Sequence, residues 1–140
     1  MDLQTLVFSM RVEEAVDLKE LKIVIADDSP VVREHLKRAL AQVEGCSLVG
    51  MAVDGAEAIN MVRALRPDIV VLDIAMPHRS GIDALKEIRR EDSEIVIIMF
   101  TADPSVVLRD VCLEAGANFY LDKSQLQELI DICEERFSVV

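Results

Sequence analysis

The chain has 140 residues, of which 51% are hydrophobic and 4% aromatic, and its formal net charge is −11. This length suits one domain with a sizeable aliphatic core. The acidic balance argues against nucleic acid and anionic membrane surfaces as partners, because both require clustered Lys and Arg. No apolar run is long enough to cross a membrane. Three scattered cysteines without metal-ligand spacing predict free thiols and a cytoplasmic location.

Five apolar runs predict five β-strands. Most of the runs are continuous rather than alternating, which is typical of strands buried on both faces. In chain order they are LKIVIA (21–26), SLVGMA (47–52), DIVVLD (68–73), EIVIIMF (94–100) and NFYLD (118–122). Between these runs and after the last one, apolar residues recur at helical spacing, and this pattern predicts five helices.

Capping residues predict where the helices begin and end. Ser29 and Asp103 each precede a proline, a pair that is typical of a helix start. Gly116 is the expected C-terminal cap of the helix before the last strand. Three further starts are predicted by capping boxes or their close relatives: Asp54 with Glu57, Ser80 with Asp83, and Ser124 with Gln127.

The strict alternation of strand and helix predicts an α/β fold with a parallel sheet and right-handed crossovers. A closed barrel of this kind normally needs eight strands, so five strands favour an open, doubly wound sheet with helices on both faces. In such sheets, ligands bind at the carboxyl ends of the strands, near the point where the strand order reverses.

Polar side chains follow the apolar runs at that edge of the sheet. They are, in chain order, Asp27 and Asp28, Asp73, Thr101, and Asp122 with Lys123. Each has an ordinary alternative, since a strand-end Asp often caps a helix, a Thr often lies in a turn, and a Lys is often solvated. Together, three carboxylates with one ammonium suit a hard divalent cation such as Mg²⁺. A carboxylate beside such a cation can attack phosphorus to give an acyl phosphate.

The motifs ADDSP, VVLDIAMPHRSG, MFTAD and FYLDKS occur in this order and spacing. Together they resemble the receiver domain of two-component response regulators, with similarity to the single-domain chemotaxis regulators. The resemblance covers about residues 20–137 and implies a flavodoxin-like sheet with strand order 2-1-3-4-5. Residues 21–137 are then the receiver domain, and residues 1–20 are an N-terminal extension, either an arm or a leader. No output domain is expected in this chain.

The resemblance also implies roles for particular residues. Asp73 would accept a phosphoryl group from the histidine of a sensor kinase or phosphotransfer protein. Mg²⁺, with Mn²⁺ as an alternative, would be held by Asp27, Asp28, Asp73 and the backbone carbonyl of Ala75. Thr101 and Lys123 would contact the phosphoryl group, while Pro77 and Gly81 match the turn after the acceptor.

A switch is implied at Thr101 and Tyr120, which would reshape the surface of the fourth helix, fifth strand and fifth helix. That surface would bind a downstream effector protein or a second copy of the chain. The alternative for Tyr120 is a strand residue with its hydroxyl at the surface. The resemblance also implies that Ala75 and Asp103, two residues past Asp73 and Thr101, flank the path of an attacking water, so we expect them to tune dephosphorylation.

The resulting prediction is a signalling module with weak self-catalysed phosphotransfer and dephosphorylation. One alternative is the truncated N-terminal receiver of a DNA-binding transcriptional regulator. A second is a Mg-dependent aspartyl-phosphate phosphatase of the haloacid dehalogenase type, although Ala75 stands where that family needs a second Asp. A third is a phosphate-blind receiver, although such chains lose the acidic pair or the Lys. Ser124 follows Lys123 where many receivers have proline, which leaves the isomer of that peptide bond open.

Overall fold

The computed structural model describes residues 20–102 and 105–139, and it confirms the predicted alternation of strands and helices. Residues 1–19 and the predicted roles of Asp103 and Pro104 lie outside the described residues. The elements are β1 (Leu21–Ala26), α2 (Pro30–Ala41), β2 (Cys46–Ala52), α3 (Gly55–Leu65), β3 (Ile69–Leu72), α4 (Gly81–Glu91), β4 (Val96–Thr101), α5 (Val106–Glu114), β5 (Phe119–Asp122) and α6 (Leu126–Val139).

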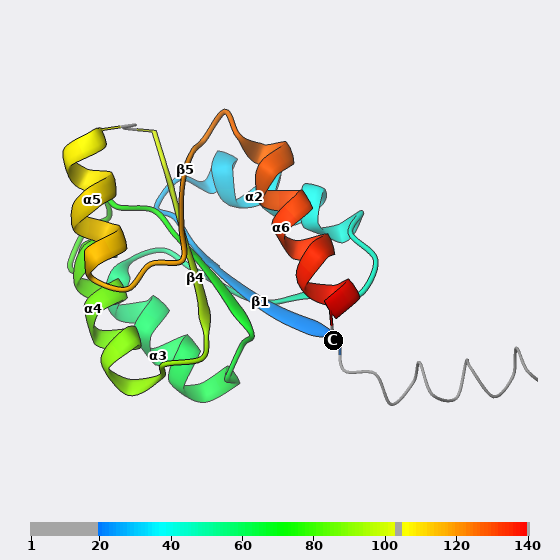
Figure 1. Cartoon of the computed structure of the whole chain (residues 1–140), viewed down its shortest axis with the longest axis horizontal. Helices are drawn as coiled ribbons and strands as arrows, with labels where there is room; N and C mark the ends of the chain where they lie inside the picture. The colour runs from blue at the N-terminus through cyan, green and yellow to red at the C-terminus, as the bar shows by residue number, and fades with distance from the viewer. Residues whose placement is uncertain (1–19, 103–104, 140) are drawn as a thin grey trace, which may run out of the picture.

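The five strands form one parallel sheet in the order β2-β1-β3-β4-β5, as predicted. Helices α2 and α6 cover one face of the sheet, and α3, α4 and α5 cover the other (Figure 1). Strands β3 and β4 are buried along their whole length, which explains why their sequences are continuously apolar. The strand order reverses at β1, which lies between β2 and β3.

Two hydrophobic clusters hold the layers together, one on each face of the sheet. Successive residues of each central strand point to opposite faces, so Ile23 and Ile25 join one cluster while Val24 and Ala26 join the other. Leu36 and Leu40 of α2 and Leu129 and Cys133 of α6 belong to the first cluster. The second cluster takes the buried residues of α3, α4 and α5.

Three helix starts agree with the capping predictions. The side chains of Ser29, Asp54 and Ser80 each accept a hydrogen bond from the backbone N–H three residues later. Helix α5 begins later than predicted, at Val106, because the hydroxyl of Ser105 accepts the hydrogen bond from the N–H of Leu108. Gly116 follows the end of α5 with φ 110°, as a C-terminal glycine should.

The predicted capping box of Ser124 with Gln127 is wrong. Helix α6 begins at Leu126, and the carboxylate of Asp122 accepts a hydrogen bond of 2.7 Å from the N–H of Ser124. The side chain of Gln125 in turn accepts the N–H of Asp122 at 2.7 Å. The residues after β5 therefore fold back on the strand end, and this turn draws Ser124 away from the helix start.

The three cysteines are free thiols, as predicted. Burial raises the pKa of each of them, and the pKa of Cys133 rises to about 12. Such thiols are almost entirely protonated at neutral pH and therefore react slowly. None of the described helices is both long and apolar enough to cross a membrane.

Candidate functional site

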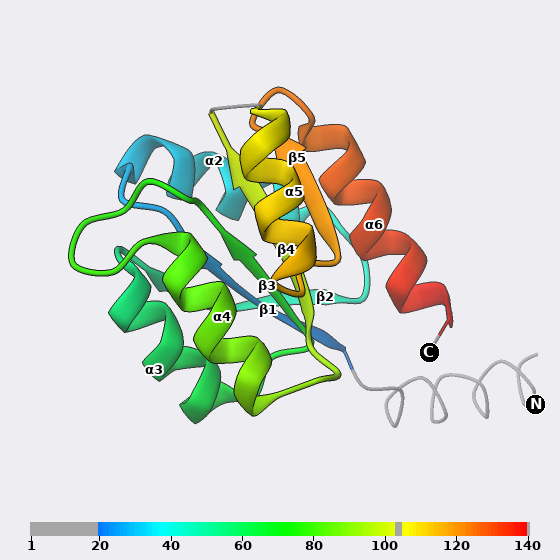
Figure 2. The same cartoon turned by 60° about the vertical axis from the view of Figure 1, so that its left-hand side comes forward.

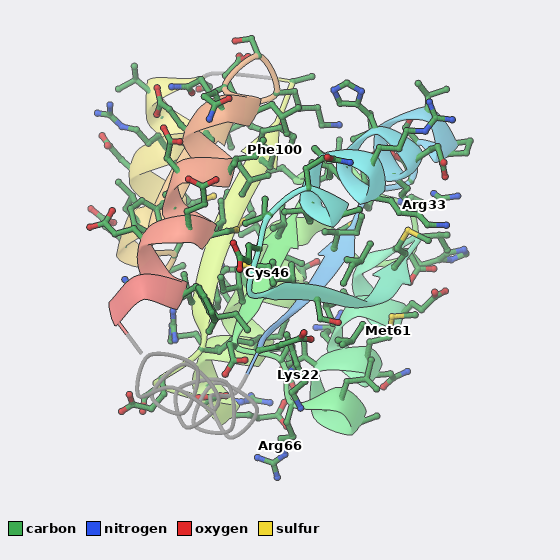
Figure 3. All side chains as sticks on the ribbon, turned by 90° about the vertical axis from the view of Figure 1, so that its right-hand side faces the viewer. Lys22, Arg33, Cys46, Met61, Arg66 and Phe100 are labelled. Carbon is green, nitrogen blue, oxygen red and sulfur yellow. The ribbon has the colours of Figure 1, made fainter. Side chains whose placement is uncertain are left out.

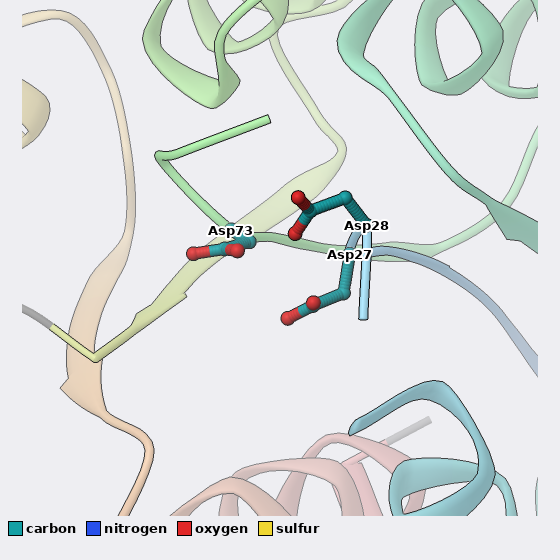
Figure 4. Close-up of side chains that lie close together, drawn as sticks. All are labelled: Asp27, Asp28 and Asp73. Atoms are coloured by element: carbon teal, nitrogen blue, oxygen red, sulfur yellow. The ribbon is translucent and has the colours of Figure 1, made fainter. Parts of the chain in front are cut away.

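Three carboxylates meet at the carboxyl ends of β1 and β3. The two strands pair so that Ala26 lies opposite Leu72, which places Asp27 and Asp73 next to each other just beyond the last paired residues. The N–H of Asp73 donates to the carbonyl oxygen of Ala26 at 3.0 Å, which fixes this register. One carboxylate oxygen from each of Asp27, Asp28 and Asp73 lies within 4.8 Å of the other two (Figure 4).

The three carboxylates differ in their exposure. Asp27 and Asp73 are 1% and 5% exposed, whereas Asp28 faces solvent. The turn after β1 is held tightly, because Asp27 Oδ1 accepts the N–H of Ser29 at 2.9 Å. The cluster thus combines two buried acids with one acid that is open to solvent.

The Lys123 ammonium reaches this cluster from the end of β5. Its Nζ lies 2.8 Å from Asp27 Oδ2 and 3.3 Å from Asp73 Oδ2. The backbone positions it, since the N–H of Lys123 donates to the carbonyl oxygen of Thr101 at 2.9 Å. The Lys123–Ser124 peptide bond is trans. Lys123 thus joins both buried carboxylates with one cationic group.

Burial is the main cause that raises the pKa of Asp73, and the neighbouring charge of Asp27 adds to it, while Lys123 acts in the opposite direction. For Lys123, burial acts to lower the pKa, but the hydrogen bonds and charges of Asp27 and Asp73 outweigh burial, so the pKa is raised. The ammonium is therefore firmly protonated, and Asp73 holds its proton more tightly than an ordinary aspartate.

This arrangement fits a divalent cation. Three ionised carboxylates and one ammonium leave two negative charges in excess, and two of the carboxylates are buried. Mg²⁺ and Mn²⁺ prefer such oxygen ligands, and Mg²⁺ usually keeps several waters as well. Ala75 is exposed in the loop just beyond Asp73.

The loop between β3 and α4 packs closely against the acidic cluster. A Cβ atom on Gly81 would overlap the carbonyl oxygen of Asp73. The N–H of Gly81 donates to the carbonyl oxygen of Ile74 at 2.9 Å, which closes the loop. The same loop contacts the start of α3, where the N–H of Gly55 donates to the carbonyl oxygen of Arg79 at 2.9 Å. Both glycines let backbones approach where a side chain could not fit.

Thr101 lies at the end of β4 and Tyr120 lies within β5, as the sequence predicted. Thr101 ends β4 beside Asp122 and is 3% exposed, so its side chain is buried at the same edge of the sheet as Asp73. Tyr120 is half-buried and packs against the hydrophobic cluster on the α3–α4–α5 face. That position leaves Tyr120 on the side of the sheet covered by α5.

Sequence reasoning missed Arg33. This residue extends from α2 (Figure 3), and its guanidinium donates a hydrogen bond of 2.8 Å to the backbone carbonyl oxygen of Asp27. It therefore helps fix the acidic turn through the backbone of Asp27. The available signal was its position one helical turn after the Ser29 cap, on the side of α2 nearest the end of β1.

Comparison with known proteins identifies the family. The sequence model described as the response regulator receiver domain matches residues 23–134. The chain belongs to this family. Two similar relatives of this receiver domain are the response regulators MprA of Mycobacterium avium (strain 104) and Mycobacterium tuberculosis (strain ATCC 25177 / H37Ra). Each is 40% identical over 111 residues, which cover 79% of this chain and 48% and 47% of the two relatives. The receiver domain thus spans about half the length of these relatives.

Solved structures agree with this assignment. A two-component response regulator of the LuxR family from Aurantimonas sp. SI85-9A1 is 35% identical, with a TM-score of 0.78, and the match covers 84% of each chain. The response regulator domain of Thermotoga maritima CheB has a TM-score of 0.77 at 26% identity, over 86% of this chain and 98% of that one. The CheX–CheY–BeF3–Mg²⁺ complex from Borrelia burgdorferi has a TM-score of 0.74 at 30% identity, and the match covers 80% of this chain and 88% of that one.

Proposed function

We propose that this receiver domain accepts a phosphoryl group on Asp73 from the phosphohistidine of a sensor kinase or phosphotransfer protein. The resulting aspartyl phosphate would change which partners bind the surface formed by α5, β5 and α6. The main support is that Asp27, Asp28, Asp73 and Lys123 converge at one edge of the sheet in a member of this family. The proposal places the chain in the cytoplasm, where its thiols stay reduced.

Asp27, Asp28, Asp73 and the backbone carbonyl of Ala75 would hold Mg²⁺, and Mn²⁺ would suit the same oxygen donors. The solved CheY complex that contains BeF3 and Mg²⁺ supports this choice of metal. When bound, the cation offsets the negative charge of the carboxylates and of the incoming phosphoryl group. The exposed Asp28 gives the site its solvent-facing ligand.

In the transfer step, a carboxylate oxygen of Asp73 attacks phosphorus, and the bond from phosphorus to the imidazole nitrogen breaks. The electron pair of that bond stays on the imidazole, and Asp73 becomes an acyl phosphate. The Lys123 ammonium, which lies 3.3 Å from Asp73 Oδ2, would then bind a phosphoryl oxygen. The Thr101 hydroxyl would donate a second hydrogen bond to the phosphoryl group.

The same residues would couple phosphorylation to the output surface. Movement of Thr101 toward the phosphoryl group would give Tyr120 room to turn inward beside α5, so that one of two conformers is favoured. Ala75 and Asp103 would set the rate at which water reaches the acyl phosphate. Exchanging either for a larger polar side chain should change the decay rate of the phosphorylated form, and an unchanged rate would remove this role.

The test is intact-mass spectrometry after incubation with acetyl phosphate and Mg²⁺. One added phosphoryl group is expected in the wild-type chain, and none in Asp73→Asn or when a chelator removes the metal. Asp110→Asn is the matched control, because Asp110 is an exposed carboxylate on α5 and should leave the uptake unchanged. Uptake in Asp73→Asn, or uptake that ignores the chelator, would contradict the proposal.

A second candidate is that this receiver controls an attached DNA-binding domain. It is favoured by the length of the MprA relatives and by the similarity to a regulator of the LuxR family. An antibody raised against this chain should then detect a longer polypeptide in the source cells, while a band at the size of the purified chain would favour a receiver that acts on a separate partner.

A further inference from the structure

Helix α5 presents an unusual amount of apolar surface to solvent. Among the described residues, seven large hydrophobic side chains are exposed, and four of them lie on this one helix: Val106, Val107, Val111 and Leu113. Val107 is 71% exposed, whereas Cys112 is the only residue of α5 that is fully buried. Apolar side chains that gather on one element in this way mark an interaction surface.

Exposed carboxylates outnumber exposed basic side chains on α5 and α6. Helices α5 and α6 lie on either side of the edge strand β5 (Figure 2), so the sides of the two helices that border β5 form one edge of the molecule, the α5–α6 surface. The exposed acidic residues of the two helices are Asp110, Glu114, Glu128, Asp131, Glu134 and Glu135. The exposed basic residues there are Arg109 and Arg136, and Arg109 lies 3.6 Å from Asp110. The α5–α6 surface is therefore negatively charged.

A hollow lies between β5 and α6 on the same surface. It has a volume of about 280 Å³ and is lined by Phe119, Ile132, Glu135 and Arg136. Phe119 and Ile132 give it an apolar floor, and both are only partly buried in the core cluster of α2 and α6. The hollow is large enough for an aliphatic side chain.

We infer that the partner of the α5–α6 surface is a protein segment that is amphipathic and basic, with aliphatic side chains on one side and Lys or Arg beside them. This inference rests on the proposed function only in taking α5, β5 and α6 as the output surface. A second copy of the chain fits less well than a basic segment, because a symmetric contact would bring together two surfaces that both carry a net negative charge. A partner with Lys and Arg instead complements both the apolar and the acidic groups.

The inference can be tested with a fluorescein-labelled helical peptide of Leu and Lys, spaced so that the Leu side chains share one side. Anisotropy titrations use the full chain at physiological ionic strength, with and without Mg²⁺ and beryllofluoride. Two further peptides are controls: a scrambled peptide of the same composition, and one with Glu in place of Lys. The amphipathic basic peptide should bind at least about 10-fold more tightly than either control, a difference of about 1.4 kcal/mol.

Charge reversal locates the binding site. Glu128→Lys with Asp131→Lys on α6 should weaken binding of the basic peptide by about 10-fold or more. Glu34→Lys with Glu94→Lys, at exposed sites on α2 and before β4, makes the same change in net charge and should weaken it by less than about 2-fold. Equal losses in the two double variants would overturn the inference, because they would show attraction to the net charge alone.

Two further outcomes separate this inference from the proposed function. Sedimentation velocity that shows a beryllofluoride-dependent dimer, which Val107→Asp disrupts, would assign the surface to a second copy and overturn the basic-partner inference. Acetyl phosphate uptake is measured in parallel on the same double variants. Loss of peptide selectivity with intact uptake counts against the inference alone, whereas selective peptide binding by a wild-type chain without uptake counts against the proposed function.

Discussion

At Asp73, burial and a neighbouring charge act in the same direction. Its side chain is 6% exposed and lies beside that of Asp27, which is 2% exposed, so burial and the charge of Asp27 both raise its pKa. Lys123 is shared between the two acids and lies closer to Asp27, at 2.8 Å against 3.3 Å. A carboxylate with a raised pKa is a stronger base and a better nucleophile once ionised, which suits the acceptor role that we propose.

Asp73→Asn should therefore stabilise the fold at neutral pH, by about 1 kcal/mol. The variant removes the repulsion from Asp27 and the cost of burying a charge, while Lys123 keeps its 2.8 Å contact with Asp27. In the wild type, the destabilisation by ionised Asp73 is complete above its raised folded-state pKa, and it disappears as the pH falls toward the pKa that Asp73 has in the unfolded chain. The advantage of the variant should accordingly shrink in acid, as measured by urea unfolding at a series of pH values.

Asp110→Asn is the control for this measurement. Its carboxylate is exposed on α5, 3.6 Å from Arg109. The substitution should therefore change the free energy of unfolding by less than about 0.5 kcal/mol at any of these pH values. A loss of stability in Asp73→Asn at neutral pH would show that Lys123 compensates the charge of Asp73 fully.

At the scale of elements, the connection from β3 to α4 leaves no room for a side chain at Gly81. Gly81→Ala should cost at least about 2 kcal/mol, because its Cβ would overlap the carbonyl oxygen of Asp73 and the backbone would have to move. Gly50→Ala is the matched control, since its Cβ would meet side chains and no backbone atom: Leu65 and Met61 at 3.1 Å and Val24 at 3.6 Å. Urea unfolding measures the loss of stability in both variants, and equal losses would contradict the close backbone approach at Gly81.

The start of α5 gives a second prediction at this scale. Ser105→Ala should destabilise the chain by about 1 kcal/mol, because the hydroxyl of Ser105 caps the helix through the N–H of Leu108. Ser124→Ala should cost less than half as much, since Ser124 lies outside α6 and its N–H is the group that binds Asp122. Thermal unfolding compares the two variants, and a larger loss in Ser124→Ala would restore the capping role predicted from sequence.

At the scale of the whole molecule, the acidic cluster predicts that metal binding stabilises the fold. Mg²⁺ at ten times its dissociation constant should raise the free energy of unfolding by about 1.4 kcal/mol, because an unfolded chain does not bring Asp27, Asp28 and Asp73 together. The gain should disappear in Asp28→Asn, and KCl at equal ionic strength should not reproduce it. Equal stabilisation by both salts would show ionic screening of the net charge instead of a site.

Much of the architecture follows from the sequence because the strands are buried on both faces. Continuous runs such as IVVL in β3 could be read directly as central strands, and their alternation with helices determines a parallel sheet. A parallel sheet gathers all strand ends at one edge, so the convergence of Asp27, Asp73 and Lys123 could be predicted without knowing any distance. The family match extends this agreement across residues 23–134.

Features that depend on competition between neighbouring groups could not be predicted. Ser105 caps α5 in place of the residue before Pro104, and Asp122 draws the N–H of Ser124 back to the strand end; both outcomes depend on local geometry that spacing does not encode. The contact of Arg33 with the Asp27 carbonyl oxygen requires the position of α2 relative to β1. The exposure of Val107 could not be predicted either, because the spacing of apolar residues along a helix does not show which of them the rest of the protein covers.

The most direct test of the account is to locate the phosphoryl group. The chain is incubated with acetyl phosphate and Mg²⁺ and reduced with borohydride, which converts an aspartyl phosphate to homoserine, and its peptides are then sequenced by mass spectrometry. We expect homoserine at position 73 and at no other aspartate, with none formed when a chelator is present. Homoserine at position 27 or 28, or none at all in the metal-loaded chain, would contradict Asp73 as the acceptor.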